Sequence, residues 1–220
     1  MKTKQNGEKE KAQPKERLLR SACQVFAEKG YHHATIPEIC RRAGANVAAV
    51  NYYFSSKENL YIEVWRHAFD VAMGKHPIDG GVTSDSTPEE RMRAFITGYV
   101  RRVFATDEAA WLPRLIVLEL SNPTDCLEQL FELAIRPQGQ TLRAIIKDLA
   151  GRDLPHDQLH ACALSVVGQC MFYALSREAR DRMTARECFT PPEVEKVAAH
   201  ISQFTLAGIR AVTAEEGEPA

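Results

Sequence analysis

Two short helical patterns with a tight turn between them carry the side chains whose types and spacing best suit a chemical role in this sequence. The first pattern covers about 36–43, the turn is Gly44-Ala45-Asn46, and the second covers 47–53. Val50 and Phe54 are four residues apart, so they share one face of the second helix and would anchor it inward. This arrangement is typical of a helix-turn-helix, whose second helix lies in the major groove of DNA.

The remaining positions of the second helix face outward in this interpretation, and their chemistry suits a duplex. Asn51 could form paired hydrogen bonds with the N6 and N7 atoms of adenine, and Val47 or Ala49 could contact a thymine methyl group. Ala48 is small enough to let the two helices approach each other. The side chains of Thr35, Tyr52, Tyr53 and Lys57 are suited to phosphates, as are the backbone amides at the helix N-termini. Asn46, the expected N-cap of the second helix, also faces outward. A helical hairpin with two exposed tyrosines and no role in DNA binding fits the same pattern.

Helices around this motif must position it. A stripe formed by Leu18, Ala22, Val25 and Phe26 predicts a helix that begins near residue 15 and ends at Gly30. Thr35 and Glu38 have the spacing of a capping box at the start of the next helix, as do Ser55 and Glu58 before a helix over 57–73.

The rest of the chain also shows helical periodicity, and no alternating strand pattern of convincing length appears. We expect an all-α fold with a loop over 74–88 and further helices near 88–105, 112–121, 125–150, 156–177 and 192–212. Pro137 should kink or break the third of these. The expected organisation is a disordered basic arm (1–14), a helix-turn-helix domain (15–60), a helical effector-binding and dimerisation domain (61–213) and a disordered tail (214–220).

Charge is distributed unevenly along the 220 residues, although the formal total is only −1. Residues 1–60 carry 11 Lys and Arg against 6 Asp and Glu, whereas the other 160 residues carry 17 against 23. A basic N-terminal quarter suits an anionic partner such as nucleic acid, or forms a tail that only aids solubility. The chain has no signal peptide and no apolar stretch long enough to cross a bilayer, so we expect a cytoplasmic protein with free thiols and no membrane partner.

Residues 16–65 strongly resemble the N-terminal domain of the TetR (tetracycline-repressor-like) family. The shared residues are Phe26, Gly30, Thr35, Ile39, Ala43-Gly44, Val50, Tyr52, Phe54, Ser56-Lys57-Glu58 and Leu60. The resemblance implies a homodimeric one-component transcription regulator, usually a repressor that a small ligand releases from DNA. It also implies DNA contacts by Thr35, Val47, Ala49, Asn51, Tyr52, Tyr53 and Lys57. Two positions depart from the pattern, because Asn51 stands where the family often has Tyr and Tyr53 where it often has His.

The C-terminal part shows a weaker likeness to a subgroup of that family whose second domain binds drug-like or aromatic compounds. The helix at 156–177 is apolar nearly all round, which predicts burial on all sides, and the last helix carries an apolar stripe that includes Gly208. These helices pack in the core of one chain, or pair with their copies across a two-fold axis; the resemblance favours the pairing. Candidates for an effector pocket are Phe95, Tyr99, Arg102, Arg114, Glu119, Gln169 and Tyr173, each of which also has an ordinary structural explanation.

The sequence gives less support to metal binding, cofactor binding or catalysis. His156 and His160 are four residues apart, but a metal site needs a third ligand, so we expect no metal, and a solvated helix end explains the pair better. The chain has no G-x-S-x-G, H-E-x-x-H or phosphate-binding glycine loop, and no Rossmann fingerprint. We therefore expect no cofactor and no catalytic residues. An enzyme with unmarked carboxylates and a DNA-binding scaffold without sequence preference remain the rival classes.

Overall fold

All regular structure in the described residues of the computed structural model is helical, as the sequence predicts. The described residues are 2–83, 85–174, 182–183 and 189–214, with side chains from Pro14 onward. The helices are α1 (Lys2–His33), α2 (Ile36–Ala43), α3 (Val47–Phe54), α4 (Lys57–Lys75), α5 (Pro88–Phe104), α6 (Trp111–Ser121), α7 (Leu127–Leu130), α8 (Arg136–Ala150), α9 (His156–Phe172) and α11 (Pro191–Thr213), with a 3-10 turn η1 (Glu108–Ala110) and a π-helical turn η2 (Phe131–Ile135).

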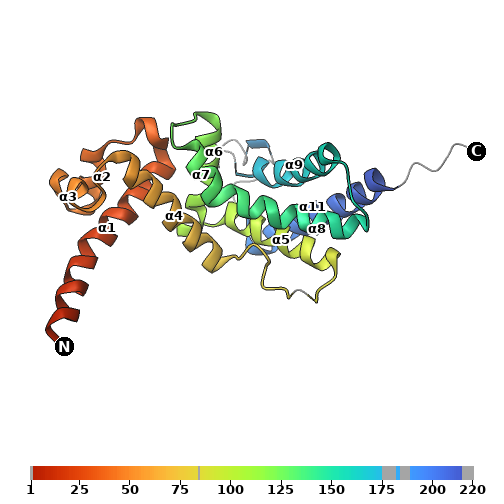
Figure 1. Cartoon of the computed structure of the whole chain (residues 1–220), viewed down its shortest axis with the longest axis horizontal. Helices are drawn as coiled ribbons and strands as arrows, with labels where there is room; N and C mark the ends of the chain where they lie inside the picture. The colour runs from red at the N-terminus through yellow and green to blue at the C-terminus, as the bar shows by residue number, and fades with distance from the viewer. Residues whose placement is uncertain (1, 84, 175–181, 184–188, 215–220) are drawn as a thin grey trace, which may run out of the picture.

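The molecule is elongated, with the short helices α2 and α3 at one end and a bundle of α5, α8, α9 and α11 at the other (Figure 1). Helix α4 runs from the first group toward the second, and α6 packs beside it. Helix α1 supports this arrangement because it packs against α2, α4 and α6. Helices α4 and α6 therefore connect the two ends of the molecule.

Two hydrophobic clusters make up the core. The first joins α1–α4 and continues into α6 and α7 through residues such as Leu112, Leu115 and Leu130. The second joins α5, α8, α9 and α11. Because the first cluster includes residues on both sides of position 60, the helix-turn-helix unit shares its core with the start of the C-terminal part.

The caps around the short helices follow the sequence except at Ser55 and at Glu38, which does not complete the expected capping box. Thr35 Oγ1 accepts from Glu38 N at 3.4 Å, and Gly30 has a positive φ of 72° where the first helical pattern ends. Ser55 does not cap α4. Its neighbour Ser56 does, with Oγ accepting from Asn59 N at 3.1 Å, because α3 continues to Phe54 and leaves Ser55 as its C-cap at φ 66°.

Several boundaries test the periodicity analysis directly. Pro137 lies in the first turn of α8, and the predicted helix over 125–150 is interrupted just before it by the π-helical turn η2, so the predicted break is confirmed. Helix α1 begins at Lys2, within the arm expected to be disordered; Lys, Glu, Gln and Ala in this segment all favour helix. The expected helix end at 175–177 and tail residues 215–220 lie outside the described residues, as does Cys188.

Helix α9 differs from its expected burial on all sides. Ala161, Leu164, Gly168 and Phe172 are exposed along one face in the single chain, while Cys162, Val166 and Cys170 face the core. The sequence shows only that the helix is apolar, not how many of its faces one chain can cover.

Within the described ranges, no helix is long and apolar enough to cross a membrane.

Candidate nucleic-acid interface and ligand domain

Helix α3 is fixed at its start and on its inner face. Asn46 Oδ1 accepts from Ala49 N at 3.0 Å, which satisfies one of the free N–H groups of the first turn. Val50 and Phe54 are buried, as the spacing predicts. The thiol of Cys40 on α2 lies 3.4 Å from the carbonyl oxygen of Asn46 and ties the two short helices together. The outer face of α3 is therefore held rigidly.

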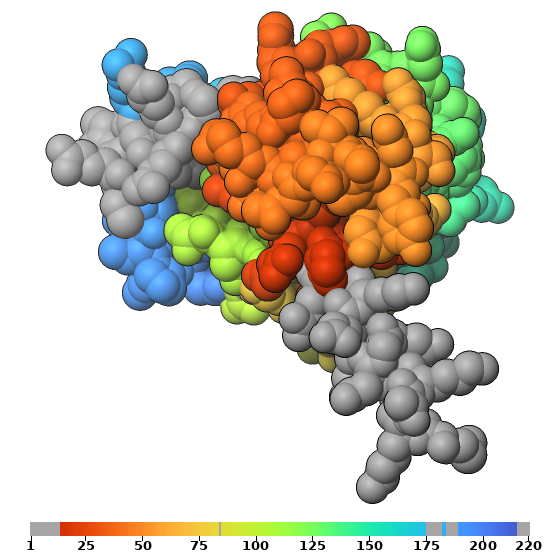
Figure 2. Space-filling model, turned by 90° about the vertical axis from the view of Figure 1, so that its left-hand side faces the viewer, coloured from red at the N-terminus to blue at the C-terminus, as the bar shows by residue number. Residues whose placement is uncertain are grey.

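That outer face carries Val47, Ala48, Asn51 and Tyr52, all exposed, with Tyr52 71% exposed. Figure 2 looks onto this end of the molecule, where the α2–α3 region forms a convex surface that the C-terminal helices leave open. Ala48 and Ala49 exchange the places that the sequence analysis gave them. Ala48 is exposed, whereas Ala49 is half-buried against the first cluster, because the helix turns so that Ala49 shares the side of Val50.

The flank of α3 is formed by aromatic and charged groups in contact. Tyr53 is half-buried, and its ring meets that of Tyr52 edge to face at 4.8 Å. Lys57 Nζ lies 4.3 Å from the centre of the Tyr31 ring, and burial lowers the pKa of this amine. Tyr31 donates a 2.7 Å hydrogen bond to Glu58. Lys57 is thus held at the edge of the surface by a cation–π contact.

Part of the positive charge on α2 is already paired. Glu38 accepts from Lys29 at 2.6 Å and from Arg42 at 2.9 Å, and these partners lower the pKa of its carboxyl group. This pairing also explains why Glu38 does not complete a capping box with Thr35. Thr35 itself is exposed at the start of α2, on the same end of the molecule as α3.

Three of the seven effector candidates come together on α5. Phe95, Tyr99 and Arg102 are buried in the second cluster, and the Arg102 guanidinium lies 5.2 Å from the Tyr99 ring centre. Only 2% of Arg102 is exposed. It donates to the His76 carbonyl oxygen at 2.6 Å and to Gln138 Oε1 at 3.1 Å, and both of these acceptors are neutral.

Burial lowers the pKa of Arg102 to about 10, which still leaves a cation at neutral pH. Desolvating a guanidinium against neutral acceptors alone is unfavourable compared with pairing it with a carboxylate. Arg102 connects the C-cap of α4 at His76 with the start of α8 at Gln138. Arg102 therefore links the end of α4 to α8 through the second cluster.

Of the other four candidates, Tyr173 packs against the second cluster, whereas Glu119, Arg114 and Gln169 are not part of it. Glu119 is buried and accepts from Tyr61 Oη at 2.8 Å and from the backbone N and Oγ1 of Thr124, so it joins α4 to the turn after α6. Arg114 is exposed on α6. Gln169 Nε2 donates toward Thr205 Oγ1 on α11 at 3.4 Å, and Tyr173 packs against Phe104. The structure therefore does not gather the seven residues into one pocket.

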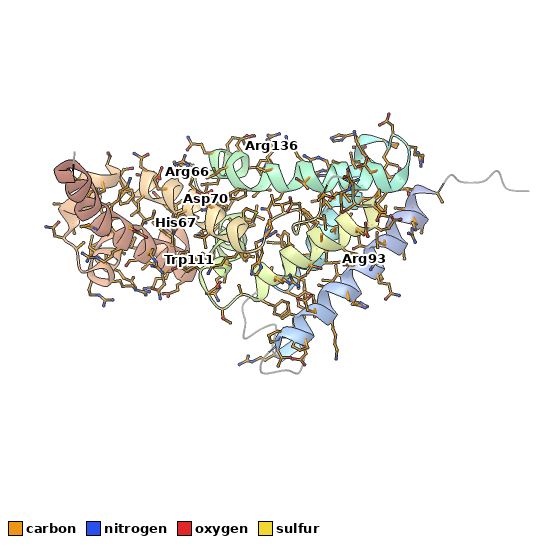
Figure 3. All side chains as sticks on the ribbon, turned by 90° about the horizontal axis from the view of Figure 1, so that it is seen from below. Arg66, His67, Asp70, Arg93, Trp111 and Arg136 are labelled. Atoms are coloured by element: carbon orange, nitrogen blue, oxygen red, sulfur yellow. The ribbon has the colours of Figure 1, made fainter. Side chains whose placement is uncertain are left out.

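A further polar group at the junction of the two ends has no counterpart in the sequence analysis. His67 on α4 lies beside Trp111 at the start of α6, with ring centres 6.2 Å apart (Figure 3). Its Nε2 atom is buried and makes no hydrogen bond among the described residues, and the same holds for Trp65 Nε1. A histidine on a predicted helix gives no sequence cue to this position, because its neighbour comes from another helix.

Two family models match successive parts of the chain, and the second match includes α6 and α7, which pack in the first hydrophobic cluster. Residues 18–64 match the model for bacterial regulatory proteins of the tetR family. Residues 88–209 match the C-terminal domain of the HTH-type transcriptional dual regulator CecR. The first match covers the surface around α3, and the second covers the helical bundle.

Individual relatives extend over nearly the whole chain. The HTH-type transcriptional repressor NicS of Pseudomonas putida is 32% identical over 207 residues, which cover 89% of this chain and 92% of that protein. The dual regulator CecR of Shigella flexneri is 25% identical over 193 residues, covering 84% and 86%. The structure of FadR from Bacillus subtilis in complex with stearoyl-CoA has a TM-score of 0.65 at 17% identity, covering 87% of this chain and 97% of that one. That likeness shows a shared fold.

Proposed function

The chain belongs to the TetR family of bacterial transcriptional regulators, and from this premise we propose that it is a ligand-responsive repressor. In this proposal a homodimer binds a palindromic operator in the cytoplasm, and a small hydrophobic or drug-like effector releases it. The relatives are named as transcriptional regulators, and the proposal gives the chain no catalytic step. NicS is named a repressor and CecR a dual regulator, so the sign of regulation has to be measured.

The exposed outer face of α3 carries the proposal. Its four outward side chains combine a paired hydrogen-bonding amide on Asn51, methyl groups on Val47 and Ala48, and the hydroxyl of Tyr52. These are the groups that recognise adenine, thymine methyls and phosphate in a major groove. We include Thr35, Asn46, Ala49, Tyr53 and Lys57 as flanking contacts. Ala49 has only its partly exposed edge available for contact.

The dimer proposed here uses the exposed faces of α9 and α11. Leu164 and Phe172 on α9 and Phe204 and Val212 on α11 are large apolar side chains left open in the single chain, with Phe204 64% exposed. A shallow groove of about 270 Å³ runs between these helices, lined by small residues such as Ala161 and Gly208. A second copy would bury its own Phe204 there. An isologous pairing of this kind matches two half-sites roughly 34 Å apart.

The response to an effector is proposed to travel along α4. Its N-terminal end is capped beside α3 by Ser56, and its C-terminal end is held through His76 by buried Arg102. A ligand that changes the packing around Arg102 would shift α4 and so alter the spacing of the two α3 helices. Such a ligand acts only through different affinities for the two spacings.

The experiment that tests the proposal is sequencing of genomic DNA fragments retained by the purified protein at about physiological salt, where purely electrostatic binding is weak. We expect an enriched inverted repeat, because two α3 helices related by a two-fold axis read the same half-site twice. Retained fragments with no common sequence would instead identify a DNA-binding scaffold. If the protein retains no DNA, mass spectrometry of the denatured sample shows whether a co-purified ligand was bound to it.

A reporter gene placed behind the recovered repeat then measures the sign of regulation. Lower expression in the presence of the protein is expected for a repressor, and higher expression would contradict that part of the proposal. An Asn51→Ala variant is the matched control for DNA recognition. This variant should keep the fold of α3, because buried Val50 and Phe54 hold the helix while the amide of Asn51 is exposed.

A further inference from the structure

A second groove lies between α8 and α9. Its volume is about 710 Å³, within the range of roughly 300–1,000 Å³ that small-molecule sites occupy. Of the exposed apolar residues assigned to the dimer face, only Leu164 also lines this groove. None of the seven effector candidates lines it.

The wall of the groove is largely aliphatic. Helix α8 and the turn before it contribute Ile135 and Leu142, and α9 contributes Leu159, Ala163 and Val167. Phe131 adds a partly exposed aromatic ring. A wall of this composition favours a flexible apolar chain, because aliphatic side chains make close contacts but no hydrogen bonds.

All the charged groups that line the groove are basic. Arg143 and Lys147 are four residues apart on α8, and neither forms an ion pair within the described part of the chain. His156 and His160 line the groove from α9, with stacked rings 6.1 Å apart. Arg136 also lines it, but Glu132 pairs with Arg136 (labelled in Figure 3).

The guanidinium of Arg143 lies in space that is open because Gly139 has no side chain. Its Nη1 atom lies 3.2 Å from the point where a Cβ on Gly139 would stand, so the guanidinium rests directly over that glycine. A side chain at position 139 would require the guanidinium to shift by a few tenths of an ångström, so the glycine leaves room for Arg143 in its present position.

The groove is basic, whereas the C-terminal part of the chain that contains it is acidic overall. Residues 61–220 carry 17 basic and 23 acidic side chains, yet no carboxylate lines the groove. Arg143 and Lys147 leave a local positive charge beside an apolar trough. A carboxylate bound there would gain charge-assisted hydrogen bonds without displacing an existing partner.

We propose that the α8–α9 groove binds an amphipathic carboxylate, with its apolar chain along the aliphatic wall and its carboxylate at Arg143 and Lys147. The identification of this ligand as the effector rests on the proposed function. Binding itself is a property of the C-terminal helices and is measured without DNA. The two ideas can therefore fail separately.

The test is calorimetric titration of the full-length protein with decanoate, below the concentration at which it forms micelles, and with decanol as the neutral match. We expect saturable binding of decanoate, and an affinity reduced about ten-fold or more in the double variant Arg143→Gln/Lys147→Gln, since each ten-fold step corresponds to about 1.4 kcal/mol. The variant Arg93→Gln/Lys196→Gln removes the same charge from α5 and α11 (Arg93 is labelled in Figure 3) and should bind as the natural chain does. Ala144→Trp places a ring over the exposed edge of the groove and should abolish binding.

Each alternative has a distinct outcome. No saturable decanoate binding, or equal loss in both charge variants, overturns the proposal. Equal affinity for decanol shows that the groove selects only an apolar chain and refutes the carboxylate site. Dissociation of the oligomer by Ala144→Trp, followed by light scattering, would show that a second copy occupies the groove instead. A circular dichroism melt of each variant confirms that lost binding does not come from unfolding.

Discussion

The outer face of α3 and the face shared by α9 and α11 both expose apolar side chains, but they differ in what accompanies them. On α3, Val47 and Tyr52 share the outer face of a capped helix with the Asn51 amide. On α9 and α11, Phe204 and Val212 line a shallow groove together with small residues such as Ala161 and Gly208. Mixed polar and methyl groups suit the edges of bases, whereas a continuous apolar face suits another protein surface.

The two faces also differ in what lies beneath them. The first hydrophobic cluster supports α3 and reaches into α6 and α7, while the second supports α9 and α11. Arg102 on α5 bonds to the His76 carbonyl oxygen at the end of α4, whereas Glu119 joins Tyr61 of α4 to the turn after α6 within the first cluster. Exposed groups thus define two surfaces, and buried Arg102 links the regions beneath them.

The largest effect is expected where the apolar face is broken. Phe204→Glu places a charge in the centre of the proposed dimer contact and should weaken dimerisation by about 2–4 kcal/mol, the range of an interface hot spot. Operator affinity should fall with it, because each monomer then binds one half-site alone. Light scattering across a dilution series measures the dimer, and Gln203→Glu, on the adjacent exposed position, is the control. An unchanged dimer in Phe204→Glu would remove the α9–α11 face from the interface.

The next effect concerns the junction. Glu119→Ala leaves the hydroxyl of buried Tyr61 and the backbone N–H of Thr124 without their acceptor, which should lower the free energy of unfolding by about 2–3 kcal/mol. Urea denaturation measures this change. Arg114→Ala, on the exposed side of the same helix, should stay within about 0.5 kcal/mol of the natural chain. If Glu119 were instead an effector ligand with no structural role, its removal would leave stability unchanged.

The sequence predicted the helices well, because they show helical periodicity and the two short ones begin at the capping residues Thr35 and Asn46. Val50 and Phe54 were placed correctly from a spacing of four residues. The exchange of Ala48 and Ala49 was not predictable, since two adjacent alanines differ only by the rotation that packing imposes. The scattered effector candidates were not predictable either: Phe95, Tyr99 and Arg102 share one helix, whereas Glu119 meets its partner from α4.

The basic and polar groups of the α3 surface should separate into two kinds of effect on DNA binding. Asn51→Ala should relax the preference at one base position by about 1–3 kcal/mol, because a paired amide contact discriminates between bases. Lys57→Ala should weaken all sequences equally and reduce the salt slope by about one, because a lysine at the edge meets phosphate. Titrations of operator and single-base variants at several salt concentrations measure both. An unchanged site preference in Asn51→Ala would refute its role as a base contact.

The smallest effect tests the boundary that joins α3 to α4, where two adjacent serines should respond in opposite directions. Ser55 adopts φ 66° and ψ −41°, a backbone conformation that strains a residue with a Cβ, so Ser55→Gly should raise the free energy of unfolding by about 1 kcal/mol. Ser56 caps α4 through its side chain, so Ser56→Ala should lower it by about 1 kcal/mol. Thermal melts of the two variants decide the matter. A loss of stability in Ser55→Gly with no change in Ser56→Ala would place the cap at Ser55, where the sequence pattern first suggested it.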